Sequence, residues 1–355
     1  MNINLLIYFQ SIQRDAVRFL PAVEKNGMIL LANIKDVAKL AGLSVGTVSR
    51  VLNNRGYISE ETKNKVHEAM QQLNYVPNEL AKSIFRQYTK TIGVMVPFVT
   101  HPYFGMIVQY LEHYASKMNY KIILCNSYFE RDKELEYFRI LKGYKVDGII
   151  LCSRNMDIHD EIQEGPPIVS IDRILSNEIP YVSSDNYQGG LLATTHLIEK
   201  GCKKIAHICG SPTLHMTANL RSNAFEETCR KNGVEPIMVA TNEDQFSSMT
   251  YYNNIQKLFQ KHPDVDGIFA SSDIIAAQVI QIAAKEGRRI PEDLKLVGFD
   301  DVNIAALTAP PLTTIHQPVK QLCKYAFELL LDEIKGEIVP MCTILPVNLI
   351  ERSST

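Results

Sequence analysis

The sequence has no apolar run of about 18 residues and no pair of closely spaced cysteines. The first absence excludes a membrane-spanning helix. The seven cysteines are scattered, their number is odd and no two have Cys-x-x-Cys spacing, which argues against a disulfide framework and against a zinc site. We therefore expect a protein of the reducing cytoplasm, with no metal and no cofactor. The cysteines are Cys125, Cys152, Cys202, Cys209, Cys229, Cys323 and Cys342.

Motifs of common enzyme classes are also missing. The sequence contains no nucleophile elbow, no phosphate loop and no His-Glu metal motif. Its 46% hydrophobic and 21% charged content is ordinary for a globular protein, and 355 residues suffice for two or three packed units. We predict that the chain is not an enzyme and has no catalytic residues.

Basic residues are concentrated near the N-terminus. Residues 31–90 contain nine Lys and Arg against five Asp and Glu, although the whole chain has a net charge of −2. A basic segment on an acidic remainder suggests a local contact with a polyanion.

The stretch "IKDVAKLAGLSVGTVSRVLNN" consists of two short amphipathic segments. Apolar residues recur at helical spacing from Ile34 to Ala41, Gly42 interrupts them, and Ser44 stands where an N-cap is expected. The apolar period resumes from Val45 to Asn53. Two helices joined by a short turn containing Gly are typical of a helix-turn-helix, whose second helix enters the DNA major groove. A third helix is predicted over residues 59–75.

From residue 91 onward, continuous apolar segments alternate with amphipathic ones. This pattern is typical of parallel sheets covered on both faces, and the number of units indicates two α/β lobes with a cleft between them. Strands are predicted at 92–97, 121–126, 147–152, 167–172, 204–209, 266–271 and 294–299. Helices are predicted at 103–118, 132–143, 187–200, 217–232, 248–261, 273–287 and 318–335.

These residues resemble the lactose/purine/galactose repressor (LacI-type) family of bacterial transcription regulators. The resemblance extends over residues 33–355 and rests on motifs in a characteristic order: "VGTVSRVLN", "YVPNELAKSI", "VSSDNYQGG", "SSDIIAA", "LVGFDD" and "PPLTTIHQP". It implies a three-helix helix-turn-helix head, a hinge helix and a sensor core of two doubly wound parallel-sheet lobes like those of periplasmic binding proteins. It also implies a homodimer that binds a palindromic double-stranded DNA operator.

The resemblance divides the chain as follows. Residues 1–32 are expected to be a flexible extension, or to precede the native start. The head occupies 33–76, the hinge helix and linker 77–90, and the effector-binding core 91–355. In that core, the first lobe is expected at about 91–185 and 317–345, and the second at about 186–316 and 346–355.

The family pattern assigns DNA contacts to the second helix and to the hinge. Val45, Gly46 and Arg50 would face bases, and Arg50 can fork onto guanine O6 and N7. Thr47, Ser49 and Asn53 would contact phosphate, next to the helix-starting Ser44. The hinge residues expected in the minor groove are Asn78, Ala81, Lys82 and the wedge residue Ile84.

The family pattern also assigns a small effector, a sugar or sugar phosphate, to the cleft. Aromatic faces for a sugar ring would come from Tyr103 and Phe104, and polar contacts from Thr217, Arg221, Asp273 and Asp300. For Asp273, capping of the following helix is an alternative role. His215 is a further expected effector contact. It stands where purine-responsive members have Arg, which argues against a purine effector.

Asp172 and Arg173, with the neighbouring Asp185 and Asn186, lie where the chain crosses between lobes. They either bind effector or stabilise the crossover. The segments "HPYF" and "YKVDGIILCSR" resemble the catabolite-control subgroup, in which a phosphorylated carrier protein is a further partner.

Two alternatives to the carbohydrate-responsive repressor stay open. Glu79 and Ile84 depart from the hinge pattern, which suggests a sugar sensor without DNA binding. The cleft aspartates suggest a carbohydrate-active enzyme, although an enzyme has no need for residues 34–84.

Overall fold

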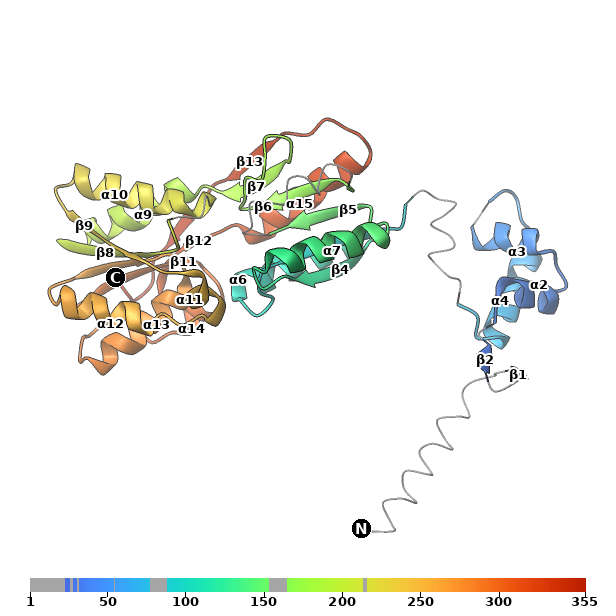
Figure 1. The fold of residues 1–355 in the computed structure, drawn as a ribbon, viewed down its shortest axis with the longest axis horizontal. Coiled ribbons are helices and arrows are strands. Elements are labelled where there is room, and N and C mark those ends of the chain that lie inside the picture. Colours follow the sequence, from blue (N-terminus) through green and yellow to red (C-terminus); the bar gives the residue numbers. More distant parts are fainter. Residues whose placement is uncertain are drawn as a thin grey trace, which may run out of the picture. The chain divides into compact units, whose positions relative to one another are not determined.

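The computed structural model of the chain describes residues 23–25, 28–30, 32–53, 55–76, 88–152, 165–212 and 216–355. It consists of two compact units, residues 1–89 and 90–355 (Figure 1). The predicted hinge contacts Asn78, Ala81, Lys82 and Ile84, and the effector residue His215, lie outside the described residues. Within the described residues, no helix is long and apolar enough to cross a membrane, and no cluster of metal-ligating side chains occurs.

The head contains the three predicted helices, α2 (Ile34–Ala41), α3 (Val45–Leu52) and α4 (Glu60–Gln72). Gly42 ends α2 at φ +67°, and the side chain of Ser44 accepts a hydrogen bond from Thr47 N, which starts α3 as predicted. The helices enclose a small core made by Val37, Ala38, Val48, Val66 and Ala69. A short antiparallel pair, β1 (Val23–Lys25) and β2 (Met28–Leu30), precedes the head; the sequence pattern did not predict it.

The first lobe is built on a sheet in the order β13-β7-β6-β5-β3-β4, with all neighbours parallel. Its strands are β3 (Thr91–Val96), β4 (Lys121–Asn126), β5 (Gly148–Leu151), β6 (Ile168–Ile171), β7 (Tyr181–Ser184) and β13 (Cys342–Leu345). Helices α6 (Pro102–Lys117) and α15 (Val319–Ile334) pack on one face, and α7 (Arg131–Gly143) packs on the other.

The second lobe is built on a sheet in the order β14-β12-β11-β10-β8-β9, in which only the β14–β12 pairing is antiparallel. Its strands are β8 (Lys204–Cys209), β9 (Glu235–Ala240), β10 (Gly267–Ala270), β11 (Lys295–Asp300), β12 (Thr313–His316) and β14 (Asn348–Ile350). Helices α9 (Asn186–Glu199) and α10 (Leu220–Lys231) cover one face, and α12 (Tyr252–Lys261) and α13 (Asp273–Lys285) cover the other (Figure 1). The shorter η2 (Thr217–Asn219), α11 (Glu243–Ser248) and α14 (Ile304–Leu307) complete this lobe. The predicted fold class of two doubly wound lobes is confirmed.

The pattern missed several elements, most of which lack a continuous apolar run. Strands β7, β12, β13 and β14 were not predicted, because they are short or interrupted by polar residues such as those of "YVSS" and "TTIH". The edge strand β9 was not predicted either, although it contains the apolar run "IMVA". The predicted helix 248–261 is also wrong at its start. Residues 243–248 form the separate α11, Met249 takes the left-handed conformation at φ +49°, and α12 begins only at Tyr252.

The chain crosses between the two sheets three times: between β7 and α9, between β12 and α15, and between β13 and β14. Asp185 and Gln317 therefore lie on crossover segments. The ends of both sheets consequently meet at these crossings, which is where a ligand cleft is expected in such folds.

Helices α9 and α10 pack closely because Gly190 has no side chain. A Cβ built on Gly190 would lie 2.5 Å from the carbonyl oxygen of Arg221 on α10. We expect Gly190→Ala to lower the free energy of unfolding by about 1–3 kcal/mol through overpacking, measured by urea denaturation. Gly143→Ala on α7, where a Cβ meets no atom within 4 Å, is the control and should leave stability unchanged or raised. Equal stability of both variants would contradict the close contact.

Candidate DNA interface and candidate effector site

The N-terminal part of α3 presents the predicted base-reading residues to solvent. Val45 is 41% exposed, and Gly46 and Arg50 are also exposed. Gly46 has free space around it, since a Cβ there would meet only Ser44 Oγ, at 3.6 Å. This face can therefore approach a groove closely, and Arg50 is its only cation.

The side chains that are predicted to contact phosphate already form hydrogen bonds within the head. The Oγ of Ser44 lies 2.9 Å from that of Thr47, and Asn53 Nδ2 donates to Ser49 O at 2.8 Å, which closes the C-terminal end of α3. Ser44 and Thr47 thus fix the start of the helix, and Ser49 and Asn53 fix its end. These bonds fix both ends of α3 within the head.

A shallow surface pocket beside α3 adds residues that the sequence reasoning missed. It is lined by Thr47 and Arg50 together with residues 55–59 and Thr62. Arg55 is exposed and Tyr57 is fully exposed. A cation and an unburied aromatic ring next to the recognition helix are a usable signal for a nucleic-acid contact.

In the core, a cavity of ≈ 110 Å³ lies between the two lobes. A cavity needs about 10–15 Å³ of such volume to hold one water molecule, so this cavity has room for a ligand of several non-hydrogen atoms. Five of the predicted effector residues line it: Tyr103, Phe104, Asp172, Arg221 and Asp300. Lining residues that the sequence did not single out include His207, Phe246, Ser271 and Gln317.

Aromatic rings from both lobes form part of the cavity wall. Tyr103 and Phe104 stand at the start of α6, and Phe246 of α11 lies against Phe104 from the second lobe, with 6.4 Å between the ring centroids. Phe246 also stacks on His101, with 5.1 Å between ring centroids. An apolar face is thus set beside the polar groups, an arrangement that suits the two faces of a sugar ring.

Asp172 is held at the end of β6 in a left-handed conformation, φ +56°. Its carboxylate accepts a hydrogen bond from the Tyr103 hydroxyl and another from Ser183 Oγ, at 2.9 Å. Burial and the Asp172 charge raise the pKa of Tyr103 well above its ordinary value, so the phenol keeps its proton and donates. Asp172 also lines the cavity, although both of its carboxylate oxygens already accept hydrogen bonds within the first lobe.

Arg221 is buried at the start of α10. Its Nε donates to Asn186 Oδ1 at 2.7 Å, its Nη1 donates to Ser271 O at 2.9 Å, and the guanidinium lies over the Phe299 ring. Burial lowers its pKa, opposed by the charges of Asp300 and Asp172. Asn186 thus serves to position Arg221, while Asp185 accepts from Gln188 N and caps α9. These two residues stabilise the crossover.

Asp300 ends β11 and is 5% exposed. Its carboxylate accepts a hydrogen bond from Gln317 Nε2 at 2.7 Å. Burial raises its pKa to about 7, although Arg221 and the Gln317 hydrogen bond act in the opposite direction. Asp300 and Asp301 both have left-handed backbones, at φ +108° and +56°, a strained geometry that is usual at functional sites.

The raised pKa of Asp300 makes the stability of the protein depend on pH. Between 3.8, the ordinary pKa, and about 7, the folded state holds a proton that the unfolded chain has released. The Asp300 contribution to the free energy of unfolding should therefore fall as pH rises through this window, with a limiting slope of about 1.4 kcal/mol per pH unit. Asp300→Asn removes the dependence. Urea denaturation of both proteins at pH 5 and pH 8 measures the difference, and parallel pH curves would contradict it.

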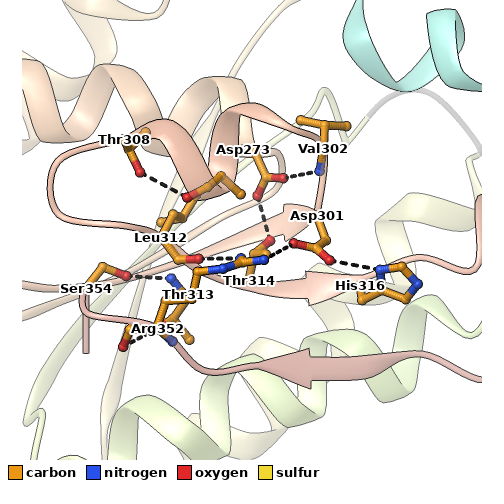
Figure 2. A network of polar contacts seen from close by, with 11 residues as sticks. Asp273, Asp301, Val302, Thr308, Leu312, Thr313, Thr314, His316, Arg352 and Ser354 are labelled. Carbon is orange, nitrogen blue, oxygen red and sulfur yellow. Dashed lines mark hydrogen bonds and ion pairs between the residues drawn. The ribbon is translucent and has the colours of Figure 1, made fainter.

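Asp273 does not line the cavity, contrary to its predicted effector contact. It is fully buried, and its carboxylate accepts hydrogen bonds from Val302 N at 2.8 Å and from Thr314 Oγ1 at 2.6 Å (Figure 2). The cap of α13 is Ser272 instead. Val302 follows β11 and Thr314 lies on β12, and both are adjacent to Asp273 at the start of α13. Asp273 therefore joins three elements of the second lobe and has a structural role.

The remaining predicted residues lie behind the cavity wall. Thr217 Oγ1 donates to Asp172 O at 2.8 Å and so joins η2 of the second lobe to the end of β6 in the first. Asp172 and Arg173 follow β6, which is continued by β7 of the same sheet, so the prediction that they lie on a crossover is wrong. Arg173 is fully buried; its Nη1 contacts Met216 Sδ at 2.6 Å, and its Nε and Nη2 have no hydrogen-bond partner within the described residues. A buried guanidinium with unpaired donors is costly, but Arg173 does not line the cavity, so its predicted effector contact stays a prediction.

Comparison with known proteins adds to this geometry. A model of the bacterial regulatory proteins of the lacI family matches residues 33–78, and a periplasmic-binding-protein-like domain matches residues 194–355. The ribose operon repressor of Halalkalibacterium halodurans is 38% identical over 330 residues, which are 92% of this chain and 97% of that protein.

Solved structures of bacterial transcription regulators are also similar to this chain. A regulator from Alkaliphilus metalliredigens in complex with D-xylulofuranose has a TM-score of 0.68 and 36% identity, and covers 75% of this chain and 99% of its own. The lac repressor dimer bound to operator and the anti-inducer ONPF has a TM-score of 0.81 and 25% identity, and covers 92% and 99%.

Proposed function

Because this chain belongs to the lacI family of bacterial regulatory proteins, and is therefore a DNA-binding transcription repressor and not an enzyme, we propose that it controls carbohydrate-utilisation genes in response to a sugar. The sugar would bind in the cavity between the lobes. We further propose that the protein binds a palindromic operator as a dimer, on the nucleoid DNA of the cytoplasm.

The observation that supports a sugar is the composition of the cavity wall. Aromatic faces from Tyr103 and Phe246 lie in the same wall as the carboxylates of Asp172 and Asp300 and the guanidinium of Arg221. Aromatic faces pack against the C–H side of a sugar ring, and carboxylates and guanidinium groups pair with its hydroxyls. A structure of a relative holding D-xylulofuranose is consistent with this ligand class.

The DNA contacts proposed for this chain are those of α3, with Arg50 reading one guanine in each half-site. Val45 would contact an apolar group such as a thymine methyl, and Arg55 and Tyr57 would contact the backbone. The hinge contacts Asn78, Ala81, Lys82 and Ile84 stay predictions, as does a phosphorylated carrier protein as a further partner.

The sugar would act by rotating the lobes about the three crossovers, a hinge transition. Both lobes contribute to the cavity, so a bound sugar favours the arrangement in which they close on it. The coupling must be reciprocal: a sugar that weakens operator binding is itself bound more weakly by the DNA complex.

The test begins with selection of bound sequences from random duplexes by the full-length protein. The selected duplex is then titrated by fluorescence anisotropy at two salt concentrations, with and without a panel of sugars and sugar phosphates. We expect a palindrome, a steep salt dependence, and an affinity that one ligand shifts. Absence of any enriched sequence would instead favour a sensor without DNA binding, and absence of any ligand effect would refute the sugar response.

A further inference from the structure

The described part of the cavity wall is poor in positive charge. Its formally charged side chains are one cation, Arg221, and two carboxylates, Asp172 and Asp300, and it contains no lysine. Two nitrogens of Arg221 already donate to Asn186 and Ser271. A phosphate dianion needs several free donors and a positive field, whereas sugar hydroxyls need both donors and acceptors.

His207 supplies an additional acceptor that no other group in the described part of the chain uses. It stands on β8 and is fully buried, with its ring stacked on Phe269 at 4.3 Å between centroids. Its Nδ1 lies 2.9 Å from Phe269 O. Because a carbonyl oxygen can only accept, Nδ1 must carry the proton, and Nε2 is left with a lone pair.

That lone pair is unsatisfied. Nε2 of His207 is buried and has no hydrogen-bond partner within the described residues, and His207 lines the cavity. An unpaired buried acceptor is costly, and the loss is recovered when a ligand hydroxyl donates to it. The oxygens of a phosphate dianion have no proton to donate and would be repelled by the lone pair, so a dianionic phosphate group does not fit beside Nε2.

We infer that the effector is an unphosphorylated sugar and that His207 Nε2 accepts a hydrogen bond from one of its hydroxyls, which makes His207 a specificity-determining residue of the site. The inference rests on the proposed sugar response. Gln317 offers a second acceptor for a sugar hydroxyl. Its Nε2 donates to Asp300, and its Oε1 is buried in the cavity wall without a partner among the described residues.

The protonation state of His207 supports this role. Burial, together with the nearby charge of Arg221, lowers its pKa to about 4. The imidazole is therefore neutral at physiological pH and does not add the positive charge that a phosphate would need.

The first experiment compares matched pairs of ligands by isothermal titration calorimetry of the full-length protein. The pairs are D-ribose and D-ribose 5-phosphate, D-xylulose and D-xylulose 5-phosphate, and D-fructose and D-fructose 6-phosphate. We expect the unphosphorylated member of the binding pair to bind at least tenfold more tightly. Tighter binding of a phosphate would overturn this inference alone. Absence of binding by these pairs and by every other sugar of the panel would overturn the proposed sugar response and this inference with it.

The second experiment replaces the acceptor and keeps the ring. His207→Phe preserves the stack on Phe269 but removes Nε2, and should weaken binding of that sugar at least tenfold. His196→Phe is the matched control, because His196 is also a nearly buried histidine of this lobe but bonds Thr355 and does not line the cavity. A His207→Phe affinity within twofold of the unmodified protein would overturn the role of His207.

A third measurement needs no variant, in case His207→Phe fails to fold in a thermal melt. Single-deoxy analogues of the bound sugar are titrated into the unmodified protein. One analogue, which lacks the hydroxyl that donates to His207, should lose at least tenfold in affinity relative to the complete sugar. Equal affinities along the whole deoxy series would overturn the hydrogen bond.

Discussion

Asp300→Ala is expected to abolish the response to sugar and to leave operator binding intact. The carboxylate lies in the cavity wall, 5% exposed and bonded to Gln317 at 2.7 Å. Removing one partner from a buried, hydrogen-bonded charged group costs about 2–5 kcal/mol, so sugar affinity should fall at least about 30-fold. The measurement is anisotropy of the operator complex across a sugar titration.

The effect should be specific to the cavity. Asp293→Ala removes a carboxylate of the same lobe that pairs with Arg289 at the surface and does not line the cavity, and the full sugar response should remain. Operator affinity without sugar should be unchanged in both variants, because residues 1–89 form a separate unit. A full sugar response of Asp300→Ala would move the effector site elsewhere.

Arg50→Ala is expected to remove sequence preference at one base pair in each half-site. Arg50 is exposed and is the only cation on α3, and a bidentate contact with guanine is worth about 1–3 kcal/mol of discrimination. Two half-sites double the loss, so affinity for the selected operator should fall at least about 30-fold. Repeating the selection with the variant identifies the position that becomes degenerate.

The contrast is Arg55→Ala, which removes a neighbouring exposed cation of the same surface pocket. It should weaken binding to all sequences alike and lower the salt dependence, as a phosphate contact does. If Arg50→Ala left the ratio of specific to non-specific binding unchanged, the assignment of α3 as the reading helix would be wrong.

The head was predictable because its signals are local. The N-cap Ser44, the turn residue Gly42 and the apolar spacing of α2 and α3 act within a few residues of one another, and the structure forms them as the sequence indicates. The third helix ends earlier than predicted, at Gln72, and Asn74 follows it at φ +47°. After glycine, Asn is the residue that most readily takes this conformation at the end of a helix, so Asn74 was a usable signal that the sequence reasoning missed.

The amino-acid sequence by itself determined the helix-turn-helix, the two α/β lobes and most of the charged residues that meet between them, because caps, apolar periods and strand-end aspartates are local patterns. Only the tertiary structure decided which of these residues face the ligand. Asp273 and Asp300 both occur at strand ends in the sequence, yet Val302 and Thr314 bond the first into the lobe, while the left-handed turn at Asp300 directs the second into the cavity. Phe246, His207 and Gln317 enter the site from α11, β8 and a crossover. Such contacts depend on packing between segments far apart in the chain, which no local pattern encodes.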